Sequence, residues 1–212
     1  DVVPEAVSLV SGYAAEDEFS VNKDGVVYVP RLRRCNDIST TEHLSVRADA
    51  TYIISGGQGA LGLVVAKFLV ERGAKYLLLL SRTPISLDTI PQEIIDLREH
   101  ANIECIACDV SQEASVFAVR DWVLRHNWPT VRGVVHAAGV LTDGTIPNQS
   151  TDKLRLAFKS KVHGARHLRA TFAPSDFLLL FSSAAATFGS AAQGSYAAAN
   201  ATLDALARSW SQ

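Results

Sequence analysis

From Thr51 onward the chain alternates short apolar runs with longer amphipathic stretches. Five short, continuous runs are predominantly apolar, as expected of parallel strands buried on both faces. They are Tyr52–Ile54, Tyr76–Leu80, Ile103–Ala107, Val131–His136 and Phe177–Phe181. Stretches with helical periodicity follow them: Leu61–Arg72, Pro91–Glu99, Ala114–His126, Lys153–Thr171 and Tyr196–Trp210. This alternation predicts an α/β fold with a doubly wound parallel sheet, which binds ligands beyond the carboxyl ends of its strands.

Residues 1–48 follow a different pattern. Phe19–Pro30 reads as two short strands around an Asn-Lys-Asp-Gly turn, and residues 31–47 form a polar connector. We expect residues 1–48 to be the tail of a preceding domain with its connector, and residues 49–212 to be the domain that contains the parallel sheet. The chain contains no Met, and its last helix is not followed by the further strand that such sheets commonly have. We therefore expect a piece of a longer protein, truncated after the helix that carries Tyr196.

Composition narrows the class of function. The chain has 212 residues, 48% of them apolar and 20% charged, with a net charge of -2. This balance is that of a globular protein without the basic excess that attracts nucleic acid or anionic membranes. No apolar run is long enough to span a membrane and no signal peptide is present, so we expect a cytoplasmic protein. Three cysteines make no disulfide framework, and the pair Cys105 and Cys108 lies in a strand-like run without a second metal-ligand pair, which favours a structural role.

A glycine-rich turn directly follows the first predicted strand and leads into a helix. It contains Gly56, Gly57, Gln58, Gly59, Leu61 and Gly62. Glycines let the backbone approach a pyrophosphate, and the amino end of the helix offers free N–H groups and a positive dipole. The motif is weak by itself, and a plain glycine turn is the alternative. Its position between strand and helix favours a Rossmann-like dinucleotide site.

The end of the second strand indicates which cofactor is bound. An acid at this point holds a free ribose 2′-hydroxyl, whereas a nearby Arg accommodates a 2′-phosphate. The chain has Ser81 and Arg82 here, which favours NADPH over NADH, although Arg82 could also be a solvated loop residue. The missing acid also disfavours a methyltransferase. Asp109 and Val110 are placed to meet the adenine ring, and His136, Ala137, Ala138 and Gly139 follow the fourth strand, where small residues allow close passage of a flat cofactor.

Polar residues that could reduce a carbonyl are predicted at the same edge of the sheet. Ser183 follows the fifth strand, and Tyr196 and Asn200 lie four residues apart on one face of the last helix. Reduction of a ketone needs a hydride and a proton for the carbonyl oxygen. A phenol can donate that proton when a nearby ammonium stabilises its phenolate. A core tyrosine is the alternative for Tyr196 taken alone.

Residues 51–212 resemble the ketoreductase domain of type I polyketide synthases, in the short-chain dehydrogenase/reductase superfamily. The matching segments are Gly56–Gly62, Leu79–Arg82, Cys108–Val110, Val135–Val140, Lys161–Ala165, Phe181–Ser183 and Tyr196–Leu206. They cover about three quarters of the chain in the family's order. Most of the superfamily carries Tyr-x-x-x-Lys, but here, as in polyketide and animal fatty acid synthase reductases, the Tyr helix carries Asn and the previous helix carries Lys.

The resemblance implies a role for each catalytic residue. Tyr196 would donate the proton, and Ser183 would hydrogen-bond the substrate carbonyl. Lys161 would hold a cofactor ribose hydroxyl and favour the Tyr196 phenolate, and Asn200 would order water for proton resupply. Lys159 competes for the lysine role, but two helical positions place it about 200° around the axis, so only one of the two can face the site. The Gly-Ala that follows Lys161 in the family favours Lys161.

The resemblance also bears on the stereochemistry of the product. A Leu-Asp-Asp motif goes with B-type reductases, which give the D-hydroxyl, and this chain matches its last position with Asp143 but has Thr142 in the middle. The opposite type carries a Trp eight residues before the catalytic Tyr, where this chain has Phe188. The pattern favours the B-type product. Asp143 before Gly144 is also an ordinary turn pair.

Three functions remain open at this stage. The first is NADPH-dependent reduction of a β-ketoacyl group on an acyl carrier protein, within a synthase polypeptide. The second is the same chemistry in a fatty acid synthase or a free short-chain reductase, and the third is an inert fragment with a structural or binding role. A metal site at His163 and His167 is disfavoured, because no Glu follows the first His as in zinc proteases, and a solvated helix face is expected instead.

Overall fold

The computed structural model describes residues 20–34, 44–83, 85 and 90–211. Contacts within the chain divide it into two units, residues 1–43 and 44–212. The described part of the first unit is an antiparallel hairpin of β1 (Ser20–Val21) and β2 (Val27–Tyr28). Asn22 Oδ1 accepts hydrogen bonds from the Asp24 and Val26 N–H groups, and Gly25 has a φ of 79°. The predicted hairpin is therefore present, although Phe19 lies outside the described residues.

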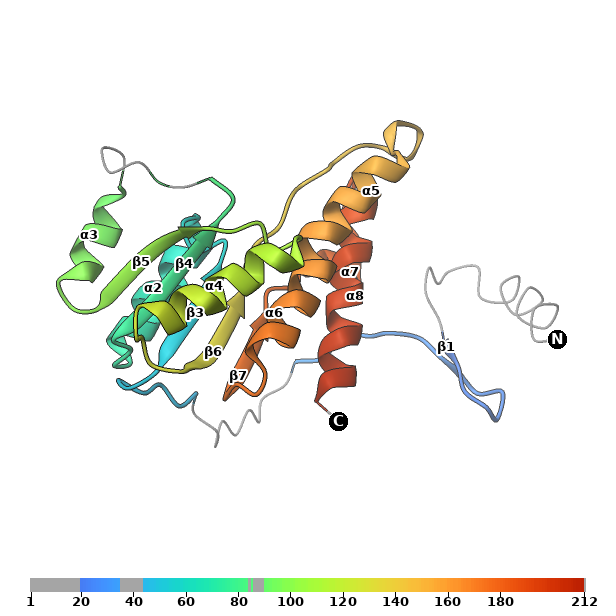
Figure 1. Ribbon diagram of the computed structural model, residues 1–212. Coiled ribbons are helices and arrows are strands. Elements are labelled where there is room, and N and C mark those ends of the chain that lie inside the picture. The colour runs from blue at the N-terminus through green and yellow to red at the C-terminus, as the bar shows by residue number, and fades with distance from the viewer. Residues whose placement is uncertain (1–19, 35–43, 84, 86–89, 212) are drawn as a thin grey trace. The chain divides into compact units, whose positions relative to one another are not determined.

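The second unit contains one sheet of five parallel strands in the order β5-β4-β3-β6-β7 (Figure 1). The strands are β3 (Thr51–Ser55), β4 (Tyr76–Ser81), β5 (Asn102–Ala107), β6 (Val131–His136) and β7 (Phe177–Leu180). The helices are α2 (Ala60–Glu71), α3 (Gln92–Arg98), α4 (Glu113–Arg125), α5 (Thr151–Phe158), α6 (Gly164–Phe172), α7 (Ala185–Phe188) and α8 (Gly194–Trp210). The chain reverses direction across the sheet between β3 and β6, so the predicted doubly wound sheet is confirmed and its switch point lies between these strands.

Alternate residues of the strands point into two separate cores. On one face Tyr52, Ile54, Leu77 and Leu79 pack against α2 and α3. On the other face Ile53, Leu78, Leu80 and Val134 pack against α4 and α6. Cover on both faces explains why β3 and β4 are buried along their length and predominantly apolar rather than alternating. None of the helices formed by the described residues is long and apolar enough to cross a membrane.

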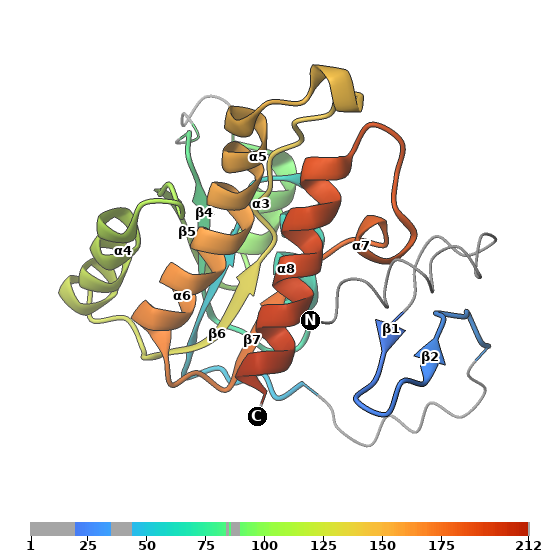
Figure 2. The ribbon, with the colours of Figure 1, turned by 90° about the vertical axis from the view of Figure 1, so that its right-hand side faces the viewer.

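Two helical features differ from the sequence predictions. The single helix expected over Lys153–Thr171 contains a π-helical turn, Lys159–His163, between α5 and α6. A short helix, α7, also precedes α8 (Figure 2) and was not expected from the small-residue run Ala184–Ala186. The π turn inserts extra backbone into the helix and so cannot be seen from a 3.6-residue period.

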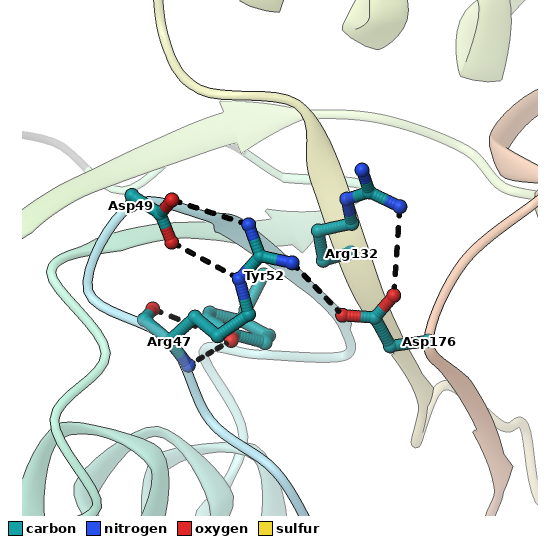
Figure 3. Close-up of polar contacts among 5 residues, drawn as sticks. All are labelled: Arg47, Asp49, Tyr52, Arg132 and Asp176. Carbon is teal, nitrogen blue, oxygen red and sulfur yellow. Dashed lines mark hydrogen bonds and ion pairs between the residues drawn. The ribbon is translucent and has the colours of Figure 1, made fainter.

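The amino ends of β3, β6 and β7 are joined by an ion-pair and hydrogen-bond network (Figure 3). Asp176 pairs with Arg132 at 3.5 Å and with Arg47 at 4.0 Å, and Arg47 also pairs with Asp49 at 3.0 Å. The hydroxyl of buried Tyr52 accepts a hydrogen bond from the Arg47 N–H at 2.6 Å and donates one to the Arg47 carbonyl at 3.3 Å. The network anchors the segment that enters the sheet.

A glycine is required beside this network. Tyr52, Gly133 and Phe177 face one another across β3, β6 and β7. The two rings stack with centroids 5.9 Å apart, and a Cβ on Gly133 would collide with both of them. The absence of a side chain at Gly133 therefore lets two aromatic side chains pack across the middle strand.

Candidate functional site

A cavity of about 610 Å³ opens at the carboxyl ends of β3, β4, β5 and β6. Its volume lies within the usual range for small-molecule sites. Many predicted cofactor residues line it: Gly56, Gln58, Gly59, Ser81, Arg82, Asp109, Val110, Ala137, Ala138 and Gly139. Leu80, Thr83, Ile85, Pro91, Cys108, Val140 and Ser160 line it as well and were not predicted as cofactor contacts. The cavity thus joins the four segments from which a dinucleotide site was predicted.

The glycine loop lies against the loop that follows β6. Gly56 has a φ of 69°, and a Cβ at this position would lie 2.9 Å from the Ala138 nitrogen. Gly57 and Gly62 are buried beneath the turn, where a Cβ on Gly57 would lie 2.9 Å from Leu79 Cα. Leu61 is 62% exposed on α2. Gly57, Leu61 and Gly62 thus lie outside the lining of the cavity, and the two glycines allow the turn to pack closely.

Lys161 connects the cavity with the helix that carries Tyr196. The Lys161 side chain is 4% exposed, and its Nζ donates a hydrogen bond of 2.8 Å to the carbonyl of Phe181, two residues before Ser183. The same Nζ lies 5.4 Å from the centroid of the Tyr196 ring. A Cβ on the cavity residue Gly139 would lie 3.1 Å from Lys161 Cε. Lys159, in contrast, is exposed, so Lys161 is the lysine of this turn that faces the site.

Burial changes the protonation of Lys161. Desolvation lowers the pKa of its ammonium from 10.5 to about 8, because the charged form loses its hydration. At neutral pH the group is still largely protonated. It can therefore act as a positive charge beside the Tyr196 ring.

Ser183 lies after β7, and Asn200 lies on α8, the helix that carries Tyr196. Ser183 is half-buried just after β7, and its Oγ accepts a hydrogen bond from the Ala185 N–H at 3.2 Å. Asn200 is fully buried on α8, and its Nδ2 donates to the carbonyl of Tyr196 at 2.8 Å. Asn200 Oδ1 is buried without a hydrogen-bond partner among the described residues. A buried amide oxygen of this kind is available to a water or a ligand hydroxyl.

The loop after β6 is bonded to the loop before α8. The Gly144 N–H donates to the Ala192 carbonyl at 2.8 Å, and Gln193 Nε2 donates to Asp143 Oδ2 at 3.1 Å. Gln149 accepts a hydrogen bond of 2.9 Å from Ser195, the residue before Tyr196. Asp143 is exposed and Phe188 is 61% exposed. The structure thus brings Asp143 to the segment that leads into Tyr196, through polar residues that sequence reasoning did not select.

His136 differs from its predicted place as a cofactor contact. Its side chain is fully buried and is not among the described residues that line the cavity. Its Nδ1 lies 2.6 Å from Ser55 Oγ and its Nε2 lies 2.9 Å from the Lys161 carbonyl oxygen. The imidazole therefore lies behind the cavity wall and contacts the turn that carries Lys161.

The histidines and cysteines that were considered for metal or redox chemistry do not form a metal site or a disulfide in the described part of the chain. Among the described residues no group of three His, Cys, Asp or Glu side chains could hold a metal ion. His163 is exposed, whereas His167 Nδ1 bonds the Val110 carbonyl at 2.9 Å and so is more than a solvated surface residue. Cys105 and Cys108 are free and pack on opposite faces of the sheet, and burial raises the pKa of both thiols.

Comparison with known proteins identifies related sequences and folds. Residues 50–212 match the KR domain family. The chain is 38% identical over 205 residues to a phenolphthiocerol/phthiocerol polyketide synthase of Mycobacterium tuberculosis, covering 89% of this chain and 11% of that protein. It is also 38% identical over 210 residues to polyketide synthase GfsA of Streptomyces halstedii, covering 97% of this chain and 3% of that protein. The chain therefore spans a small part of these relatives.

Solved structures show the same fold. A ketoreductase domain from the bacillaene assembly line superposes with a TM-score of 0.83 at 28% identity, covering 97% of this chain and 49% of that one. The first ketoreductase of the tylosin polyketide synthase superposes with a TM-score of 0.78 at 33% identity, covering 95% of this chain and 43% of that one. An A1-type ketoreductase also superposes, with a TM-score of 0.81 at 28% identity, covering 95% and 43%.

Proposed function

The chain belongs to the KR domain family of polyketide synthases, oxidoreductases of the short-chain dehydrogenase/reductase superfamily, and from this premise we propose the substrate, the cofactor and the catalytic residues. The proposed reaction is NADPH-dependent reduction of a β-ketoacyl thioester, held on an acyl carrier protein, to the β-hydroxyacyl thioester. The proposed surroundings are the other domains of a cytoplasmic synthase polypeptide. The single observation that carries the proposal is the position of Lys161 between the cavity and Tyr196.

The cavity fits a dinucleotide phosphate. Gly56 and Gly59 leave room for a pyrophosphate at the amino end of α2, and Asp109 and Val110 border the space for an adenine. Arg82 is exposed at the end of β4, where its guanidinium can hold a 2′-phosphate, which supports NADPH. When bound, the nicotinamide supplies the hydride that reduces the carbonyl carbon.

The protein supplies the proton and stabilises the carbonyl oxygen. As that oxygen gains negative charge, the Tyr196 hydroxyl donates its proton to it, and the Ser183 hydroxyl donates a second hydrogen bond. The Lys161 ammonium, 5.4 Å from the Tyr196 ring centroid, stabilises the phenolate that remains. Asn200 Oδ1 can hold a water that returns the proton to Tyr196. The step balances, because one hydride and one proton convert the ketone to the alcohol.

The stereochemical proposal rests on Asp143. The hydrogen bond from Gln193 holds its carboxylate at the segment before Tyr196, a position from which it can bias the direction of substrate entry. Phe188 stands where the opposite type carries Trp, which supports the D-configured β-hydroxyl. One of the similar solved structures is an A1-type ketoreductase, so overall similarity of fold does not distinguish the two product types. The proposed stereochemistry therefore depends on Asp143 and Phe188.

A test of this function follows NADPH absorbance with a small β-keto thioester as substrate. We expect turnover by the wild-type chain and a loss of about 100-fold or more for Tyr196→Phe, which removes the proton donor. Tyr76→Phe removes the same hydroxyl at the amino end of β4 and should retain the wild-type rate. Equal rates for Tyr196→Phe and wild type would overturn the mechanism. A wild-type chain that neither binds NADPH nor turns over would instead support an inert structural fragment.

A further inference from the structure

The buried imidazole of His136 belongs to a series of hydrogen bonds in which every donor and acceptor can be assigned. The Lys161 carbonyl oxygen can only accept, so His136 Nε2, 2.9 Å away, carries the proton. In the neutral ring Nδ1 is then an acceptor, and the Ser55 hydroxyl, 2.6 Å away, donates to it. Ser55 Oγ accepts in turn from the Ala138 N–H at 3.4 Å. The series of hydrogen bonds thus leads from the Ala138 N–H through Ser55 and His136 to the Lys161 carbonyl.

The surroundings of the ring favour this neutral form. His136 is fully buried, and desolvation lowers its pKa from 6.5 to about 4. The positive charge of the Lys161 ammonium lowers the pKa of His136 further, because it disfavours a second positive charge. Gly164 permits the close approach of the ring, since a Cβ there would lie 3.0 Å from His136 Cε1.

Each member of this series lies next to a part of the proposed site. Ser55 is the last residue of β3, directly before the glycine loop, and Ala138 lines the cavity. Lys161 belongs to the π-helical turn and projects its ammonium to the Phe181 carbonyl and the Tyr196 ring. The regular hydrogen-bond pattern of an α-helix does not fix the position of a π-helical turn. A hydrogen bond from the sheet to the backbone of the turn can fix that position.

We infer that His136 is a positioning residue that holds the Lys161 turn against the ends of β3 and β6, and so sets where the ammonium lies relative to the cofactor cavity and Tyr196. The inference rests on the proposed function for the role of Lys161. The placement itself is a property of the protein alone and can be measured without turnover.

The first test is the tautomer of His136 in the ¹⁵N-labelled wild-type chain, observed by long-range ¹H–¹⁵N correlation spectroscopy. The His136 signals are assigned by their loss in His136→Gln. We expect a neutral ring with the proton on Nε2, unchanged at pH 6. A proton on Nδ1, or a charged ring at pH 6, would overturn the inference.

The second test follows the Lys161 pKa through its ¹³Cε shift, assigned with Lys161→Met. His136→Leu removes both ring bonds, so we expect the Lys161 pKa to move from about 8 toward 10.5 as the turn loosens and water reaches the ammonium. His136→Gln keeps a donor for the Lys161 carbonyl and should stay near wild type. His163→Leu, an exposed change on the same turn, is the matched control. An unchanged Lys161 titration in folded His136→Leu would overturn the inference.

NADPH affinity gives a third readout, for which we expect His136→Leu to bind about tenfold more weakly and His136→Gln to restore binding. If His136→Leu does not fold, Ser55→Ala takes its place, because it removes only the donor to Nδ1, and we expect the His136 tautomer signals and the Lys161 pKa to shift in it. Ser55→Ala with both unchanged would contradict the inference. If the wild type binds no NADPH, the proposed cofactor fails, while the tautomer and the Lys161 titration still decide this inference.

Discussion

The two ends of the parallel sheet place their polar groups in different surroundings. At the amino ends, Arg47, Asp49, Arg132 and Asp176 form ion pairs whose side chains are 33–76% exposed, so water screens them. At the carboxyl ends, Lys161, His136 and Asn200 are buried, and their polar atoms depend on one another or remain unpaired. Exposed ion pairs add little stability, whereas buried polar groups cost stability and hold reactive groups in place. We therefore expect mutations at the amino ends to change stability alone, and those at the carboxyl ends to change binding and catalysis, in some cases with a gain in stability.

The largest effect on stability is expected at the packed rings of the amino end. Gly133→Ala places a Cβ against the Tyr52 and Phe177 rings, and we expect it to lower the unfolding free energy by about 2–3 kcal/mol. Urea unfolding followed by circular dichroism measures the loss, and NADPH affinity of the folded fraction should be unchanged. Gly194→Ala, where a Cβ meets nothing within 4 Å, is the control and should be close to neutral.

At the carboxyl end, Arg82 should separate the two cofactors. Arg82→Ala removes the charged partner proposed for the 2′-phosphate, so we expect NADPH to bind about 10- to 100-fold more weakly, with little change for NADH. Fluorescence titration with both cofactors measures the ratio. Arg120→Ala, which removes an exposed arginine from α4, should leave the ratio at the wild-type value. Equal losses for both cofactors in Arg82→Ala would contradict a 2′-phosphate site.

Lys161 should show that function and stability oppose each other at this end. At pH 7 burial of the ammonium is unfavourable, so we expect Lys161→Met to raise the unfolding free energy by about 1–2 kcal/mol while the reductase rate falls. The unfolded chain keeps the Lys161 proton to about pH 10.5, whereas the folded chain loses it near pH 8. Between these pH values the unfolded state binds more protons than the folded state, so the unfolding free energy of the wild type increases with pH. The stability advantage of Lys161→Met should therefore shrink as the pH rises from 8 to 10.5.

Thermal and urea unfolding across this range would measure the stability difference. Lys159→Met changes the exposed lysine of the same turn and should alter neither stability nor activity. If Lys161→Met is less stable than wild type at pH 7, Lys161 stabilises the fold. That result would contradict the claim that the buried polar groups at the carboxyl end cost stability.

The smallest effect is expected from the exposed network. Asp176→Asn should change the unfolding free energy by about 0.5 kcal/mol or less, because each ion pair it makes is screened by water. Tyr52→Phe should cost more, about 1 kcal/mol, since the lost hydroxyl is buried and bonds the Arg47 backbone. Urea unfolding at low and high salt distinguishes the two, because only the Asp176→Asn effect should fade with salt.

Much of this arrangement could be predicted from the sequence, and the rest depends on contacts between distant residues. The strands lie within one residue of their predicted ends, because a strand covered on both faces is predominantly apolar. Gly56, Arg82 and Gly139, which line the cavity, were selected from the sequence because a phosphate loop and a flat cofactor need particular residue types beside a strand. The π turn could not be predicted, since the helical periodicity of Lys153–Thr171 continues through it.

The bonding of His136 was missed for a different reason. Its partners lie 81 and 25 residues away, so no local pattern links it to Ser55 or Lys161. The available signal was a polar residue at the carboxyl end of each of two mainly apolar strands, Ser55 on β3 and His136 on β6. In adjacent strands such residues meet at one edge of the sheet, and two buried polar side chains there can supply each other with a hydrogen-bond partner.

The measurement that tests the central claim most directly is an NADPH titration of the ¹⁵N-labelled chain followed by backbone NMR. We predict shifts that saturate with NADPH and concentrate at the carboxyl end of the sheet, in Gly56–Gly59, Ser81–Arg82 and Ala137–Gly139. The amino end, at Arg47, Arg132 and Asp176, should not shift. Absence of saturable binding, or shifts centred on the amino end, would contradict the assignment of the cofactor site.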